Sequence, residues 1–169
     1  MPNTYMRIGS VTVGAGGSAS ISFTSIPSTY TDLLVKVSGR NSGTSSQLLI
    51  TVNSSTTDYS GKRLFNNVGT SAASTNTNTA NLNPSGGVGS AFTADTFGNT
   101  EIYIPNYTSN EYKTFSIDGT PENNAVENYN TIVAGLWSNT AAITSIGLVA
   151  AGGNFVQHST AYLYGIKNS

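Results

Sequence analysis

Residues 33–38, Leu-Leu-Val-Lys-Val-Ser, decide the fold class of this chain. Leu33, Val35 and Val37 alternate with Lys36 and Ser38, so an extended strand would carry the apolar side chains on one face and the polar ones on the other. The same alternation recurs along the sequence. It predicts about nine strands, at 7–13, 20–24, 33–38, 48–52, 101–104, 114–117, 132–137, 143–149 and 161–166.

Turn-forming residues separate these segments, at 14–17, 41–43, 118–119 and 152–153. No segment has apolar residues at helical spacing over three turns, so we expect very little helix. Inner faces of alternating strands that pack against each other form a sandwich. We therefore predict one all-β domain over 1–169, a single β-sandwich that is jelly-roll-like rather than immunoglobulin-like.

The segment 67–99 is an exception to this pattern. It is rich in Thr, Ser, Asn and Gly, and its only charged residue is Asp95. A structureless loop of this length is uncommon in a compact domain. Two interpretations stay open: a flexible polar loop on the surface, or an arm that becomes ordered against a neighbouring subunit. The anchors of such an arm would be Leu82, Val88, Phe92 and Phe97.

The composition argues against several classes of partner. Charged residues make up 9% of the chain, the net charge is -1, and the basic residues are scattered, with only Lys62 and Arg63 adjacent. Nucleic acid binding requires a clustered basic face, so we expect no nucleic acid partner. No apolar stretch approaches the roughly 20 residues that span a bilayer, and residues 1–5 do not resemble a signal peptide. We expect no membrane association.

Residues that could perform chemistry are sparse. There is no cysteine, and His158 is the only histidine, which leaves few ligands for a metal. Asp118, Glu122 and Glu127 lie close in sequence, and paired carboxylates could hydrolyse glycosides. Their setting in a polar loop favours solvated charges, although a loop calcium site stays open. We expect no enzyme activity and no cofactor.

Aromatic residues are candidates for contacts with a partner. The chain has nine tyrosines and one tryptophan. In alternating strands such rings most often serve a core or a subunit interface, but they can also stack on sugars. Together with the arm anchors, they give the candidate contacts to other subunits or partners: Leu82, Val88, Phe92, Phe97, Tyr107 and Trp137.

Four stretches carry a resemblance to a known group of proteins: 26–33 (Ile-Pro-Ser-Thr-Tyr-Thr-Asp-Leu), 101–107 (Glu-Ile-Tyr-Ile-Pro-Asn-Tyr), 135–139 (Gly-Leu-Trp-Ser-Asn) and 161–166 (Ala-Tyr-Leu-Tyr-Gly-Ile). As a set they resemble small structural proteins of tailed bacteriophages, especially those of cyanobacteria and other aquatic hosts. The resemblance covers most of the chain outside 67–99. It implies a virion component, either a capsid decoration protein or a fibre-type appendage, and brings no catalytic motif.

From this resemblance we expect a capsid decoration (cement) protein. It would be made in the host cytoplasm and bind the major capsid protein at the capsid surface, as a homotrimer that stabilises the shell. The alternative is the receptor- or glycan-binding tip of a tail or head fibre, in which tyrosines and the 67–99 segment would contact host-surface glycan.

Overall fold

The computed structural model describes residues 4–45, 47–67, 70–84, 87–121 and 129–167. In these ranges the chain forms strands that pair antiparallel throughout, and no helix is present. The strands are β1 (Tyr5–Thr12), β2 (Ser20–Phe23), β3 (Asp32–Gly39), β4 (Leu48–Val52), β5 (Tyr59–Asn67), β6 (Thr70–Thr79), β7 (Gly98–Ile104), β8 (Lys113–Thr120), β9 (Tyr129–Trp137), β10 (Ile146–Ala150) and β11 (Thr160–Ile166).

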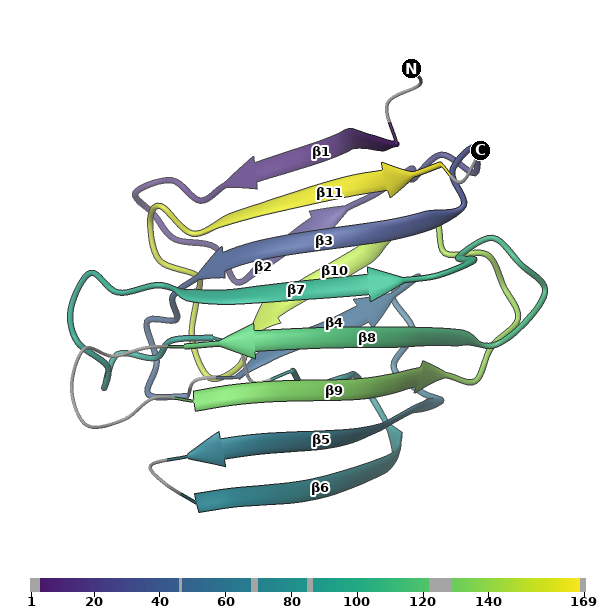
Figure 1. Ribbon diagram of the computed structural model, residues 1–169. Coiled ribbons are helices and arrows are strands. Elements are labelled where there is room, and N and C mark those ends of the chain that lie inside the picture. The colour runs from purple at the N-terminus through teal and green to yellow at the C-terminus, as the bar shows by residue number, and fades with distance from the viewer. Residues whose placement is uncertain (1–3, 46, 68–69, 85–86, 122–128, 168–169) are drawn as a thin grey trace.

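The strands build two sheets that stack face to face (Figure 1). The large sheet has eight strands in the order β1-β11-β3-β7-β8-β9-β5-β6, and the small sheet has three in the order β2-β10-β4. From β1 to β5, and again from β9 to β11, the chain crosses from one sheet to the other at every connection. The prediction of an all-β sandwich is confirmed.

The core lies between the two sheets, and the alternation that predicted the strands supplies it. On β3, Leu33, Val35 and Val37 point inward and are buried, whereas Lys36 and Ser38 are exposed. Side chains of the small sheet meet them from the other side. Because the small sheet covers one face only, the other face of the large sheet is open to solvent; we call it the outer face.

The segment 67–99 differs from the predicted loop or arm. Its first part is β6, which pairs with β5 and forms one edge of the large sheet. Leu82 then extends the small sheet, because its backbone exchanges two hydrogen bonds of 2.9 and 3.0 Å with Ile50. Further on, the Arg40 guanidinium donates hydrogen bonds to the carbonyls of Phe92 and Thr93. The described parts of this segment therefore lie against the chain's own sandwich.

Two other details correct the expectation from sequence. Residues 118–119 are not a turn, since both lie within β8, where Gly119 pairs with Thr131 of β9. The strand predicted at 143–149 begins only at Ile146, the first residue of β10. Ile143 lies before it as a buried residue, and its N–H donates a hydrogen bond of 2.9 Å to the Tyr107 carbonyl.

The first and last strands share a corner of the large sheet. Tyr5 of β1 pairs with Ile166 of β11, and Lys167 donates a backbone hydrogen bond of 3.1 Å to Thr4. Figure 1 shows the start of β1 and the end of β11 at this corner, at the side of the sheet opposite β6.

Candidate functional site

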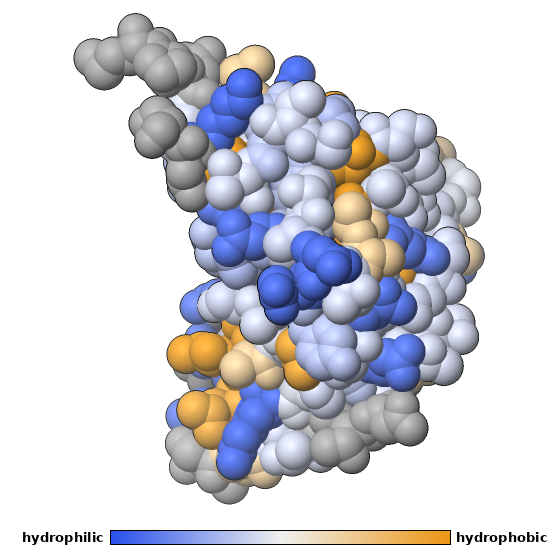
Figure 2. Space-filling view, turned by 90° about the vertical axis from the view of Figure 1, so that its right-hand side faces the viewer, coloured by the Kyte–Doolittle hydropathy of each residue, from blue (hydrophilic) through white to orange (hydrophobic). Residues whose placement is uncertain are grey.

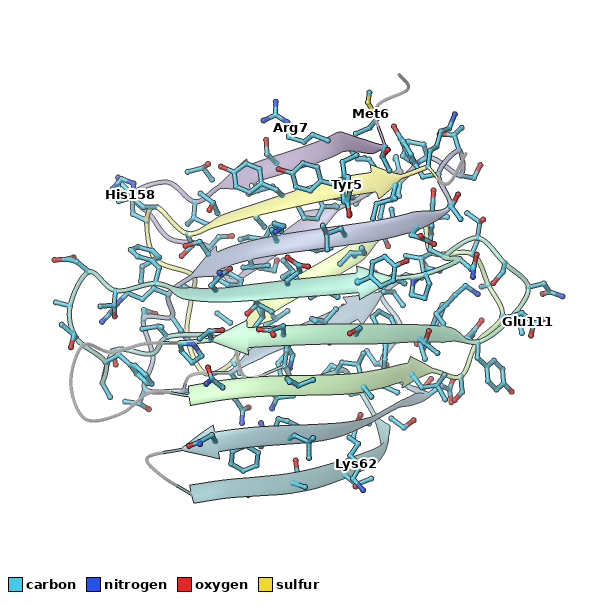
Figure 3. All side chains as sticks on the ribbon, in the orientation of Figure 1. Tyr5, Met6, Arg7, Lys62, Glu111 and His158 are labelled. Carbon is cyan, nitrogen blue, oxygen red and sulfur yellow. The ribbon has the colours of Figure 1, made fainter. Side chains whose placement is uncertain are left out.

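Among the described residues, those considered for chemistry form no group that could hold a metal ion. His158 is exposed on the connection before β11, at the opposite end of the strands from Glu111 (Figure 3). Asp118 points to the outer face of β8, and Glu122 and Glu127 lie outside the described residues. In the described part of the chain, no three His, Asp or Glu side chains are grouped so that they could hold a metal ion.

The candidate partner contacts lie mostly inside the chain's own core. Leu82 lies against Gly61 and Gly135 of the large sheet. Trp137 stacks on Tyr59, with ring centroids 6.3 Å apart. Of the six candidates, only Phe97 keeps a partly exposed side chain, whereas the buried ones are Leu82, Val88, Phe92, Tyr107 and Trp137. Their burial is explained within one chain, so the proposals below depend on other residues.

One candidate surface is apolar and lies near the β6 edge of the outer face. We call Leu64, Ala73 and Ile132 the hairpin patch. Ile132 of β9 pairs with Leu64 of β5, which pairs with Ala73 of β6, so the three form a row on one face. Leu64 and Ile132 are 55% and 59% exposed. Figure 2 shows hydrophobic side chains gathered here, at the lower left of the view.

The hairpin patch lies where β5 and β6 reach beyond the small sheet (Figure 1). On their inner face, Phe65 is only half-buried, and the Arg63 guanidinium lies over its ring at 4.5 Å. Together with the patch, Asn66 and Asn130 line an open depression of about 510 Å³. Among the described strands, β6 has a partner on one side only. It contains neither a charged residue nor a proline, the usual devices that keep an edge from pairing.

A second candidate surface lies at the other end of the outer face. We call Tyr5, Tyr103, Tyr162 and Tyr164 the tyrosine face. Tyr162 and Tyr164 are two residues apart on β11, and Leu34 of β3 pairs with both Tyr164 and Tyr103. Tyr5 reaches from β1 across β11 toward the middle of the sheet (Figure 3). Four rings from three strands therefore occupy one surface.

Charged and polar groups lie beside these rings. The Lys36 ammonium and the Glu101 carboxylate form an ion pair at 2.7 Å, both about half-exposed. The hydrogen bond to Glu101 is the main reason that the pKa of Lys36 is raised above its ordinary value. Asp118 pairs with Glu101 on the next strand, and with Lys36 and Asn99 they line a polar depression of about 220 Å³.

The ring of Tyr103 is held in place from below. Its hydroxyl donates a hydrogen bond of 2.8 Å to one carboxylate oxygen of the buried Asp32. The other oxygen of that carboxylate accepts a hydrogen bond of 2.9 Å from the Asn106 N–H. Because the phenol donates to a carboxylate, the pKa of Tyr103 is raised.

Sequence reasoning assigned the tyrosines in general to a core, a subunit interface or a sugar contact. It did not identify the surface that Tyr162 and Tyr164 form with Tyr5 and Tyr103. The hairpin patch was missed altogether. The available signal was the pair of apolar residues Leu64 and Ile132, but only the strand order shows that they are neighbours.

No protein-family model matches the sequence, and no curated protein matches it. Nothing among the described residues forms a helix of the length and apolarity that a membrane crossing requires.

Proposed function

We propose that this chain is a structural protein of a bacteriophage particle, a capsid decoration protein that binds the major capsid protein and stabilises the shell. The hairpin patch is the observation that carries the proposal. Leu64 and Ile132 are large apolar side chains, side by side and more than half exposed. Contact with another protein would bury them, with a gain of about 25 cal/mol per Å² of apolar area. The phage assignment is supported by the sequence resemblance described above.

The neighbouring edge of β6 supports the same role. Its free N–H and C=O groups could pair with a strand of the capsid protein, as exposed sheet edges do in many complexes. Two polar atoms of the same hairpin, Asn66 Oδ1 and Ser74 Oγ, are buried without a hydrogen-bond partner in the part of the chain that the structure describes. A bound strand or side chain could satisfy them.

In this role the chain would act as a homotrimer on the capsid surface. Each copy would contribute one β-sandwich that binds without a conformational change. The stabilisation of a shell would come from many copies, each contributing a modest burial of apolar area.

Capsid shells stripped of the protein provide the test. Wild-type protein, a Leu64→Glu/Ile132→Glu variant and a Val149→Glu control should be added back and the bound copies counted. Val149 is also an exposed apolar strand residue, but it lies on β10 of the small sheet. Wild type and control should coat the whole shell, and the double variant should not. Binding of wild type at one vertex or on the tail alone would overturn the proposal.

The second candidate function is the receptor-binding tip of a fibre. The tyrosine face favours it, because aromatic rings beside polar groups suit a saccharide ligand. Immunogold labelling of intact particles separates the two functions. Label over the whole shell supports decoration, and label at fibre ends supports the tip.

A further inference from the structure

The tyrosine face offers apolar rings at regular positions. Tyr162 and Tyr164 are about 7 Å apart along β11, and Tyr164 and Tyr103 are roughly 10 Å apart across two strand spacings. Between them, Leu34 also points outward, yet it is only 6% exposed. In the part of the chain that the structure describes, no second sheet covers the outer face, so the neighbours of Leu34 on this face cover it. The rings therefore lean over the sheet and can present a face to a ligand.

Tyr5 belongs to the same cluster. After the larger effect of Glu101, Tyr164 and Tyr5 both add to the raised pKa of Lys36. Tyr5 also contributes, after Asp32, to the raised pKa of Tyr103. One phenol thus lies near both β3 and β7, although its own strand is at the edge of the sheet. It is 58% exposed, so most of its ring is available to a ligand.

The charges around the rings are not positive overall. Arg7 and Lys36 supply two positive charges, against the three carboxylates of Asp32, Glu101 and Asp118. Lys36 is already paired with Glu101. A phosphorylated or acidic ligand in the polar depression would meet the carboxylates of Glu101 and Asp118 without a free cation to compensate. The local charge favours an uncharged ligand with many hydroxyl groups.

A neutral saccharide has the matching chemistry. The C–H groups on one face of a sugar ring form an apolar surface that packs on an aromatic ring, while its hydroxyls need donors and acceptors at the rim. Asn99, Asp118 and the Lys36–Glu101 pair supply these groups in the 220 Å³ depression. Binding would cost little side-chain conformational entropy, because the Tyr103 hydroxyl and the ion pair are already held in place.

We infer that the tyrosine face binds a neutral oligosaccharide that lies across β11, β3 and β7, with Tyr5, Tyr103, Tyr162 and Tyr164 as stacking platforms and the depression beside Lys36 as the polar subsite. The inference deepens the second of the two proposed functions and rests on it for its biological meaning. It does not depend on the hairpin patch.

Calorimetric titration of the full chain tests the inference. The probes are neutral gluco-, manno- and galacto-oligosaccharides, with acidic uronate oligosaccharides of the same length for comparison. At least one neutral probe should bind saturably and more tightly than every acidic one. Tyr164→Ala should weaken that binding about tenfold or more, a loss of about 1.4 kcal/mol. Absence of binding by all neutral probes, or tighter binding of an acidic one, would overturn the inference.

Two further variants separate a loss of saccharide binding from a loss of stability and from the general effect of removing an exposed tyrosine. Tyr164 helps to cover Leu34, so Tyr164→Ala could lose stability; Tyr5→Ala removes a more exposed ring and should also weaken binding severalfold. The matched control is Tyr112→Ala, because Tyr112 has the same 58% exposure but lies on the connection before β8, outside the tyrosine face. Equal losses in Tyr112→Ala and Tyr5→Ala would contradict the assignment of the site.

The outcomes also separate this inference from the proposed functions. The Leu64→Glu/Ile132→Glu variant should keep the affinity for the saccharide, and the tyrosine variants should still coat capsid shells. If labelling places the chain at a fibre tip and no neutral saccharide binds, the tip function stands and this inference fails.

Discussion

The hydroxyl of Tyr103 and the carboxylate of Asp32 form a hydrogen bond of 2.8 Å that ties the outer face of β7 to the start of β3. The same carboxylate accepts the N–H of Asn106 in the turn after β7. One buried charge thus fixes both the position of a surface ring and the path of the chain beside it.

Replacement of this carboxylate should change the titration of Tyr103. In Asp32→Asn the phenol loses its charged acceptor, so the pKa of Tyr103 should fall back toward the ordinary value of 10.0. The hydrogen bond to Asp32 that raises the pKa of Tyr103 stabilises the wild-type fold. This contribution is fully present below pH 10.0 and is lost as the pH rises through the folded-state pKa. Ultraviolet titration of tyrosinate should show the shift, with Tyr103→Phe identifying the signal. An identical titration curve in Asp32→Asn would contradict the linkage.

Lys113 is a buried cation whose ammonium hydrogen-bonds three backbone carbonyls. Its ammonium donates hydrogen bonds to the carbonyls of Ser109, Glu111 and Thr140, and so holds the turn before β8 against the loop after β9. Lys113→Met leaves these acceptors without their donor and should lower the free energy of unfolding by about 1–3 kcal/mol. Urea denaturation measures the change, and the exposed Lys62→Met should change it by less than about 0.5 kcal/mol.

The pH dependence of this effect has a definite sign. Burial lowers the pKa of Lys113 below its ordinary value of 10.5, so the unfolded chain binds the proton more strongly than the folded chain. The contribution of Lys113 to stability therefore increases as the pH rises from the folded-state pKa to 10.5. The difference in stability between wild type and Lys113→Met should widen in that range. A constant difference across it would show that the ammonium is not desolvated.

Gly165 marks a close approach between β11 and the Tyr30 ring. A Cβ at position 165 would overlap the ring atoms of Tyr30. Gly165→Ala should therefore lower stability by about 1–3 kcal/mol through overpacking. Gly14→Ala is the matched control, because a Cβ there meets nothing within 4 Å. Thermal unfolding that is equally affected by both changes would mean that the ring moves aside freely.

A substitution of Leu82 tests whether the 67–99 segment packs on the sandwich of its own chain or on a neighbouring subunit. Leu82→Ala removes a core side chain that lies against Gly61 and Gly135, and should lower the free energy of unfolding by about 2–5 kcal/mol. The loss should be the same at every protein concentration, and the exposed Leu64→Ala should cost far less. A loss that appears only at concentrations where the chain associates would instead make Leu82 an anchor on a neighbouring subunit.

Most of the strands that sequence predicted are buried on one face, and β1 is the exception. Alternation records burial, so β3, with Leu33 and Val35 facing the small sheet, was identified directly. Strands β5 and β6 were missed for the same reason. β6 has no large apolar side chain. On β5, among the side chains that the structure describes, only Tyr59 at its start is fully buried against the core, so neither strand carries a strong pattern of period two.

The candidate surfaces depend on information that a local pattern does not contain. Tyr103 and Tyr164 approach each other because β3 pairs with both β7 and β11. Leu64 and Ile132 meet because β5 joins β9 rather than a neighbour in sequence such as β4. Such pairings are set by how the whole sandwich closes, which single segments do not determine.

The shared corner of β1 and β11 bears on how the protein can be tagged. Because Tyr5 pairs with Ile166, an affinity handle or fluorescent protein attached at either end would project from the same place. That place is remote from β6 but adjacent to Tyr5. Under the two proposals, a fusion would lie far from the hairpin patch but would crowd the tyrosine face, so sugar titrations call for cleaved, untagged material.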